Sequence, residues 1–297
     1  MTALWIPVTL AAAIAQTGRN AAQRGLTERL GTLGATNVRF LFGLPFACAF
    51  LALALWLTGA TLPALTSRAL TFTAIGAAAQ IAATALMLQA MRTQGFAIVT
   101  AWLKVEPVLV ALTGWAVLGE ALTLPMLAAI AVSIAGVLVM TLKPGQGRAM
   151  LSGLGPAALG LSAGLAFGLS AIGFRGAITA LPQGDFLIRA LTILALTLAL
   201  QTLALGLWLA LRDRPALTGS ARAFAPSLAA GFLGALASAF WFTGFALTTA
   251  ANVRTLALVE VILALALARF MLGQRATSRQ LGGIVLLLLG VILLLRA

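Results

Sequence analysis

The sequence has no histidine, one cysteine and only six acidic residues among its 297 positions. Without histidine the chain lacks the commonest metal ligand and proton shuttle, and Cys48 alone excludes an internal disulfide or a cysteine-ligated metal. It also shows no phosphate-cradling glycine loop and no paired acid and base for hydrolysis. We therefore expect no enzyme, no metal and no cofactor. The alternative from that class is an intramembrane enzyme without a recognisable catalytic set.

Charge is also scarce, because charged residues make up 8% of the chain and hydrophobic residues 62%. This much apolar surface exceeds what one soluble core could bury, whereas a bilayer can solvate it. The net charge of +13 comes from basic residues that lie one or two at a time in short loops between apolar runs and not in one patch. We expect a membrane protein whose partners are the lipid bilayer and a small-molecule substrate, with no nucleic acid, and a monomer or weak dimer.

Ten apolar stretches are long enough to cross a bilayer, at about 20 residues each. The first lacks a preceding Lys or Arg and a cleavage site, so we expect it to stay in the protein as a span and not to be removed as a signal peptide. The predicted spans are 2–24, 33–57, 70–91, 95–118, 124–142, 153–175, 185–211, 224–248, 251–273 and 279–296.

The chain repeats itself at an offset of 154 residues, which pairs Glu106 with Glu260 and Thr123 with Thr277 without a gap. The same offset pairs Gly136 with Gly290. Lys143–Arg148 is a polar break between residues 1–144 and 150–297, which we predict to be two repeats of five helices each. Because five is odd, the second set enters the membrane from the opposite side. The predicted fold is an all-α integral membrane protein with ten transmembrane helices in two inverted-topology repeats.

The stretch Trp102 to Met140, with Glu106-Pro107, Leu118-Gly119-Glu120 and Gly136, resembles the EamA-type repeat of the drug/metabolite transporter superfamily. Leu258 to Leu294 resembles its degenerate partner. The resemblance implies a ten-helix, multi-pass transporter of the cell inner membrane with a central cavity between the two repeats. The family includes bacterial YddG-like exporters of amino acids, so the resemblance also implies export by alternating access.

Several predicted helices carry one face of hydroxyl, amide, aromatic or carboxylate groups, and we expect these faces to line the cavity. Glycines 160, 164 and 168 form a separate ridge, which we interpret as a site of close helix packing. The cavity candidates are Thr9, Gln16, Gln80, Thr84, Trp102, Glu106, Ser162, Ser170, Trp241, Phe245 and Glu260.

The two carboxylates permit more than one interpretation. An ionised side chain near mid-bilayer costs about 3 kcal/mol on insertion scales, so Glu106 and Glu260 should face protein or water. They either form a structural pair or act in transport, through substrate or through a proton. Lys104 cannot share the face of Glu106, because two residues turn a helix by about 200°. It either extends toward the membrane surface, pairs with a carboxylate on a neighbouring helix, or meets an anionic substrate group.

A cavity with few fixed charges, small residues and aromatics suits amino acids, especially hydrophobic or aromatic ones, better than phosphorylated compounds. Another metabolite or drug class is the alternative. Energy coupling stays open between proton antiport and facilitated diffusion. The loops after odd-numbered spans hold most of the arginines, which predicts termini outside the cytoplasm, whereas the family resemblance implies termini inside.

Overall fold

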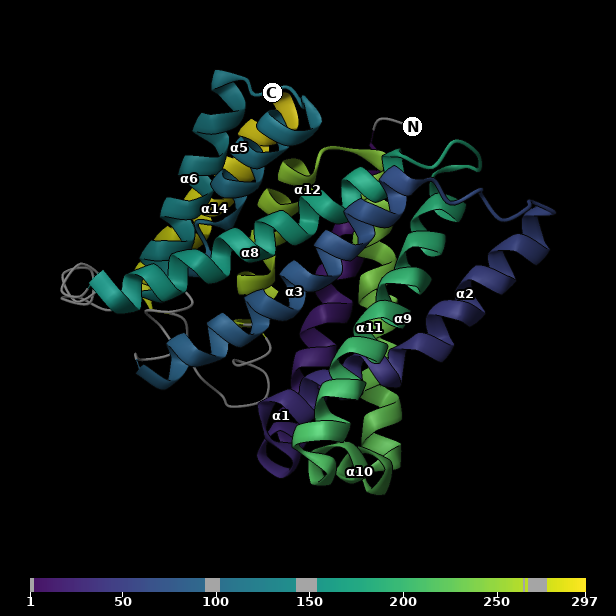
Figure 1. Cartoon of the computed structure of the whole chain (residues 1–297). Coiled ribbons are helices and arrows are strands. Elements are labelled where there is room, and N and C mark those ends of the chain that lie inside the picture. Colours follow the sequence, from purple (N-terminus) through teal and green to yellow (C-terminus); the bar gives the residue numbers. More distant parts are fainter. Residues whose placement is uncertain (1–2, 94–101, 143–153, 264, 267–276) are drawn as a thin grey trace. The chain divides into compact units, whose positions relative to one another are not determined.

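We describe a computed structural model of the chain, covering residues 3–93, 102–142, 154–263, 265–266 and 277–297. The predicted break Lys143–Arg148 lies outside the described residues. Every regular element in the described ranges is a helix (Figure 1). The helices are α1 Trp5–Leu41, α2 Gly43–Thr58, α3 Ser67–Thr93, α5 Glu106–Leu118, α6 Leu124–Thr141, α8 Leu154–Thr179, α9 Phe186–Arg212, α10 Arg214–Arg222, α11 Phe224–Leu247, α12 Ala250–Leu256, η1 Ala257–Val259 and α14 Ser278–Arg296.

Two compact units form within the chain. The first unit comprises Met1–Ala78 and Gly173–Thr248, and the second comprises Ala79–Ile172 and Thr249–Ala297. Two of the unit boundaries fall inside α3 and α8, and the third lies between α11 and α12. Each unit therefore contains residues from both halves of the sequence.

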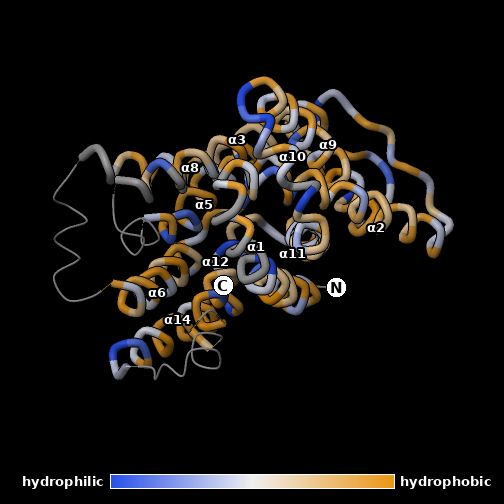
Figure 2. Tube along the Cα trace, turned by 90° about the horizontal axis from the view of Figure 1, so that it is seen from below, coloured by the Kyte–Doolittle hydropathy of each residue, from blue (hydrophilic) through white to orange (hydrophobic). Residues whose placement is uncertain are grey.

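Seven helices in the described part are long and apolar enough to cross a membrane. Orange, apolar stretches dominate them in Figure 2. They are Leu33–Thr58, Ser67–Met87, Leu124–Thr141, Ala158–Thr179, Phe186–Arg212, Phe224–Leu247 and Ser278–Arg296, and Glu106–Leu118 is a shorter apolar helix. The seven correspond to predicted spans two, three, five to eight and ten. Parts of the fourth and ninth predicted spans lie outside the described residues.

The N-terminal region forms two helical parts with a break inside the expected loop, residues 25–32. Helix α1 covers Trp5–Leu41, and its helical geometry is broken at Gly31, with φ 66° and ψ 176°. Arg19 and Arg39, on either side of this break, both approach Gly234 of α11, so the two parts of α1 fold back on each other. Glycine adopts this positive φ without the steric cost that a side chain would bring. The predicted loop thus corresponds to the kink between the two helical parts, and the basic residues around it are compatible with helix.

Repeat-matched threonines begin two repeat-matched helices. Thr123 Oγ1 accepts a hydrogen bond from the Met126 amide at the start of α6. Thr277 accepts one from the Gln280 amide, and the Gln280 side chain bonds back to the Thr277 amide, which completes a capping box at the start of α14. Both caps satisfy amides that would otherwise lack a partner at a helix start.

The second unit packs α6 directly against α14. Gly290 lies against Ser133, whereas Gly283 lies against Met140. Residues nearer the start of α6 therefore contact residues nearer the end of α14, so the two helices run antiparallel. The absence of side chains at Gly136, Gly283 and Gly290 permits backbone-to-backbone approach, as expected for helices packed within a membrane.

The first unit is built around α1 and α11, with α9 and α2 beside them. Gly231 of α11 lies against Phe42, which precedes α2. Gly76 and Gly173 bring α3 and α8 together, because a Cβ on Gly173 would lie 2.7 Å from the Gly76 Cα. Phe174 then stacks on Phe242 with ring centroids 4.7 Å apart.

Candidate functional site

Two interrupted helical segments position the carboxylates in the second unit. Lys104 and Val105 form a turn, and α5 begins at Glu106 with Pro107 next to it. Proline favours the first turn of a helix, where its missing amide hydrogen needs no partner. In its described part, the predicted helix 95–118 is therefore interrupted at Lys104 and Val105. The Glu106 carboxylate lies in the first turn of α5, where the helix dipole favours negative charge.

The second carboxylate lies at a comparable interruption. Helix α12 ends at Leu256, the 3₁₀ turn η1 covers Ala257–Val259, and α-helix resumes at Glu260. The predicted helix 251–273 is therefore not continuous either. A tighter 3₁₀ turn changes the angle between successive residues. Residues before η1 therefore do not share a helix face with Glu260 in the way that regular α-helical spacing predicts.

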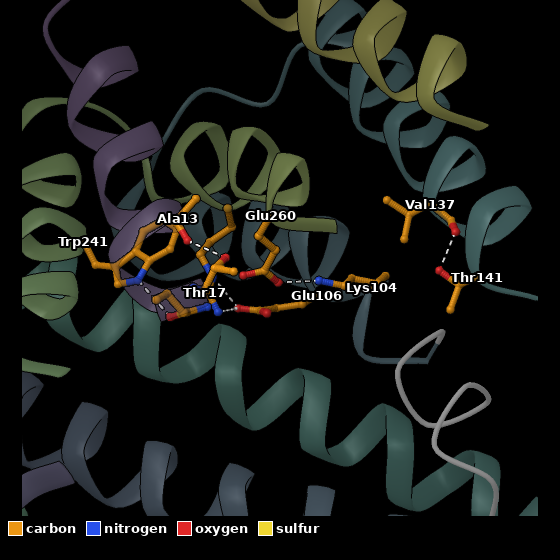
Figure 3. Close-up of polar contacts among 10 residues, drawn as sticks. Ala13, Thr17, Lys104, Glu106, Val137, Thr141, Trp241 and Glu260 are labelled. Carbon is orange, nitrogen blue, oxygen red and sulfur yellow. Dashed lines mark hydrogen bonds and ion pairs between the residues drawn. The ribbon is translucent and has the colours of Figure 1, made fainter. Parts of the chain in front are cut away.

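Each carboxylate forms an ion pair with a cation from the other segment. Lys104 Nζ lies 2.5 Å from Glu260 Oε1, and Arg254 Nη2 lies 2.5 Å from Glu106 Oε1, with its Nε at 2.6 Å. Figure 3 shows the Lys104–Glu260 contact beside Glu106. Each of the segments 104–106 and 254–260 thus supplies one cation and one carboxylate to these crossed ion pairs. We call Lys104, Glu106, Arg254 and Glu260 the charge tetrad.

The charge tetrad is neutral overall and only partly accessible. The side chains of Lys104 and Glu106 are each 14% exposed, Arg254 is 20% exposed and Glu260 is 25% exposed. Unpaired charges at such positions in a membrane are costly, and mutual neutralisation offsets this cost. Of the alternatives for Lys104, pairing with a neighbouring carboxylate is the one that the structure shows.

Trp102 lies one turn before Glu106 and packs on the glycine ridge. A Cβ on Gly160 would lie 2.7 Å from the Trp102 Cβ, and one on Gly168 would lie 3.3 Å from the Val110 side chain. This confirms that the ridge is a site of close packing. The indole Nε1 of Trp102 is buried and has no hydrogen-bond acceptor within the described ranges. A buried donor of this kind costs free energy until water or a ligand accepts its hydrogen bond.

The other candidates in the second unit differ in their surroundings. Thr84 Oγ1 donates to the Gln80 carbonyl at 2.9 Å. Ser170 is buried and donates to the Phe167 carbonyl at 2.8 Å, whereas Ser162 on the same helix is exposed. The face predicted from Ser162 and Ser170 therefore does not have uniform surroundings.

Four candidates lie in the first unit. Trp241 Nε1 donates to Gln16 Oε1 at 3.0 Å, which joins α11 to α1 (Figure 3). Phe245 is buried with its ring centroid 6.4 Å from that of Phe242. Thr9 is fully buried, and its Oγ1 has no hydrogen-bond partner in the described part of the chain.

Sequence reasoning missed Arg254. Its signal was a lone arginine inside the apolar stretch predicted as the ninth span, and an ionisable residue in such a stretch is by default a functional candidate. Among the described residues, no group of three or more His, Cys, Asp or Glu side chains could hold a metal ion.

Comparison with known proteins addresses the fold and the family. A solved structure titled only as a crystal structure of a protein superposes with a TM-score of 0.72 at 14% identity, covering 99% of this chain and 96% of that one. At this identity the likeness concerns the fold alone. No curated protein sequence matches the chain. The sequence profile of the EamA-like transporter family matches residues 3–142 and again residues 155–296. The chain thus belongs to the EamA-like transporter family and is a multi-span membrane protein.

Proposed function

We propose that this membrane transporter carries small zwitterionic metabolites, chiefly amino acids with hydrophobic or aromatic side chains. The observation that carries the proposal is the crossed pairing within the charge tetrad. A substrate that bears both an ammonium and a carboxylate group can exchange partners with both ion pairs, so that no charge is left alone. A phosphorylated anion would meet two carboxylates along with the two cations, and repulsion would offset its attraction.

The groups next to the charge tetrad suit an apolar amino acid. The Trp102 N–H can donate a hydrogen bond to a substrate carboxylate, and the indole ring offers apolar surface. Leu109 and Val110 lie close by and pack against the glycine ridge. We propose Trp102, Glu106, Glu260 and Arg254 as substrate-contacting residues. The remaining cavity candidates stay sequence predictions.

We further propose ten spans in two inverted repeats that work by alternating access. Helices α6 and α14 are matched by the repeat and run antiparallel. Inverted topology requires repeat-matched segments to have opposite directions, so this contact supports it. Interrupted helices beside charged groups are also typical of such transporters.

Export through the cell inner membrane is proposed from the family resemblance. The two carboxylates permit either coupling to protons or facilitated diffusion. If one carboxylate binds and releases a proton during transport, Glu106→Gln or Glu260→Gln should abolish any response to a pH gradient. If transport is facilitated diffusion, the pH response of these variants should equal that of the wild type.

The direct test is release of a panel of labelled amino acids from proteoliposomes, with and without a pH gradient. Protein-free liposomes and liposomes with the Lys104→Met/Glu260→Met variant serve as controls, because the variant removes one ion pair and keeps the charge balance. We expect release of leucine- or phenylalanine-like substrates by the wild type and a loss of at least tenfold in the variant. Failure on every amino acid, with exchange of phosphorylated sugars, would contradict the proposed substrate class.

A further inference from the structure

Helix α10 joins the ends of two candidate membrane spans in the first unit. Helix α9 ends at Arg212 and α11 begins at Phe224, and both are long and apolar enough to cross a bilayer. The nine residues of α10, RPALTGSAR, include two arginines and only two aliphatic side chains larger than a methyl group, those of Pro215 and Leu217. A helix of this polarity between two spans belongs at the membrane surface and not in the hydrocarbon.

The two sides of α10 have different surroundings. Ala216 is buried against α1, where a Cβ on Gly34 would lie 3.3 Å from the Ala216 Cβ, and Gly219 faces Leu30 of the same helix. Arg214, Thr218 and Arg222, at a spacing of four residues, form the opposite side and are exposed. The arginines of α10 therefore point away from the protein.

Exposed apolar side chains lie next to these arginines. Trp208 and Leu211 in the last turn of α9, and Phe224 at the start of α11, are all exposed. Side chains of this kind on membrane spans face acyl chains, with Trp enriched where the headgroups begin. The arginines at the end of α9 and in α10 consequently lie at the depth of the headgroups.

Three exposed arginines lie between the end of α9 and the start of α11. Arg212 ends α9, Arg214 begins α10 and Arg222 ends α10. Asp213 lies between them, but its carboxylate accepts the Ala216 amide at 3.1 Å and caps α10. Arg214 Nε donates to the Ala210 carbonyl, which holds this side chain beside the end of α9. We call Arg212, Arg214 and Arg222 the α10 surface.

We propose that the α10 surface binds the headgroups of anionic phospholipids. Guanidinium groups bind phosphate oxygens through paired, charge-assisted hydrogen bonds, and basic residues at the membrane surface attract anionic lipid. The apolar edge formed by Trp208, Leu211 and Phe224 places acyl chains directly below. This role is independent of the transported substrate, because it uses residues of the first unit and the charge tetrad lies in the second.

The test measures lipid selectivity of the full chain. Purified protein is placed in mixed phosphatidylglycerol and phosphatidylcholine micelles, and lipids retained on the protein are counted by native mass spectrometry. The test variant is Arg212→Gln/Arg222→Gln, which leaves the Asp213 cap and the Arg214–Ala210 bond in place. The matched control is Arg68→Gln/Arg296→Gln, which removes two other exposed arginines.

We expect the wild type to retain phosphatidylglycerol in preference to phosphatidylcholine. In the test variant, that preference should fall about fivefold for each arginine removed, and in the control variant it should not change. High salt should lower the preference of the wild type, which gives a reading that depends on no variant. An unchanged preference in the test variant, an equal loss in the control, or a preference insensitive to salt would each overturn the proposal.

Discussion

Glu106 and Glu260 occupy matching positions of a duplicated sequence, yet their partners do not match. An offset of 154 residues from Lys104 gives Leu258, and from Arg254 it gives Thr100. The duplication therefore placed the two anions, whereas each cation arose in one copy only. Such asymmetric pairing explains why reasoning from the repeat found the carboxylates and missed Arg254. A cation without a repeat partner leaves no trace in the alignment of the two halves.

Removing one member of the tetrad should destabilise the protein. Glu106→Gln removes the ion pair between Glu106 and Arg254. We expect the free energy of unfolding to fall by more than the ~1 kcal/mol of an exposed pair and by up to the ~3–5 kcal/mol of a fully buried one. We expect a smaller cost for Glu260→Gln, because the Glu260 side chain is 25% exposed against 14% for Glu106. Thermal unfolding in detergent measures both.

The double variant Glu106→Gln/Arg254→Gln is the matched control, since it removes both charges of one pair. It should recover most of the stability lost in Glu106→Gln and should remain impaired in transport. Wild-type transport by both single carboxylate variants and by Glu106→Gln/Glu260→Gln would show that the carboxylates are only relics of the duplication.

Helix boundaries were predictable wherever apolar runs end at clear signals. Thr123 and Thr277 begin α6 and α14 as the repeat suggested, and Asp185 caps α9. Helix α10 was not predicted although Asp213 and Pro215 are ordinary signals of a helix start, because it is polar and too short to cross a bilayer. Pro107 is a local signal for the helix start at Glu106, whereas no proline or glycine marks the 3₁₀ turn η1.

The α6–α14 contact gives a prediction for two adjacent glycines. A Cβ on Gly283 would lie within 3.0 Å of the α6 backbone, whereas a Cβ on Gly282 would meet nothing within 4 Å. We expect Gly283→Ala to destabilise the protein by about 1–3 kcal/mol through overpacking. Gly282→Ala should be neutral or stabilising by up to about 1 kcal/mol, because alanine favours helix. Thermal unfolding of the two variants compares them directly, and equal behaviour would refute the close packing of α6 on α14.

At the scale of the whole molecule, composition predicted a multi-span membrane protein and the family resemblance implied a transporter, and the family match confirms both. The sequence could not reveal that the compact units each draw on both halves of the chain, because that arrangement depends on contacts between distant helices. The count of ten spans rests on segments that lie partly outside the described residues.

An even number of spans predicts that both termini lie on the same side of the membrane. The excess of basic residues in the loops after odd-numbered spans predicts that this side is outside the cytoplasm. Reporters that are active in only one compartment, fused separately to the N- and C-terminus, measure both statements. Termini on opposite sides would contradict the ten-span topology, and termini together inside would contradict the charge-based orientation alone.

The central claim is that paired opposite charges select a zwitterion, and substrate analogues of single charge test it most directly. Proteoliposome uptake of labelled phenylalanine is compared with that of N-acetylphenylalanine, which keeps only the negative charge, and phenylalanine amide, which keeps only the positive one. Each analogue would leave one charge of the tetrad unpaired, so we predict uptake of the amino acid at least tenfold faster than uptake of either analogue. Uptake of either analogue as fast as that of phenylalanine would contradict the account.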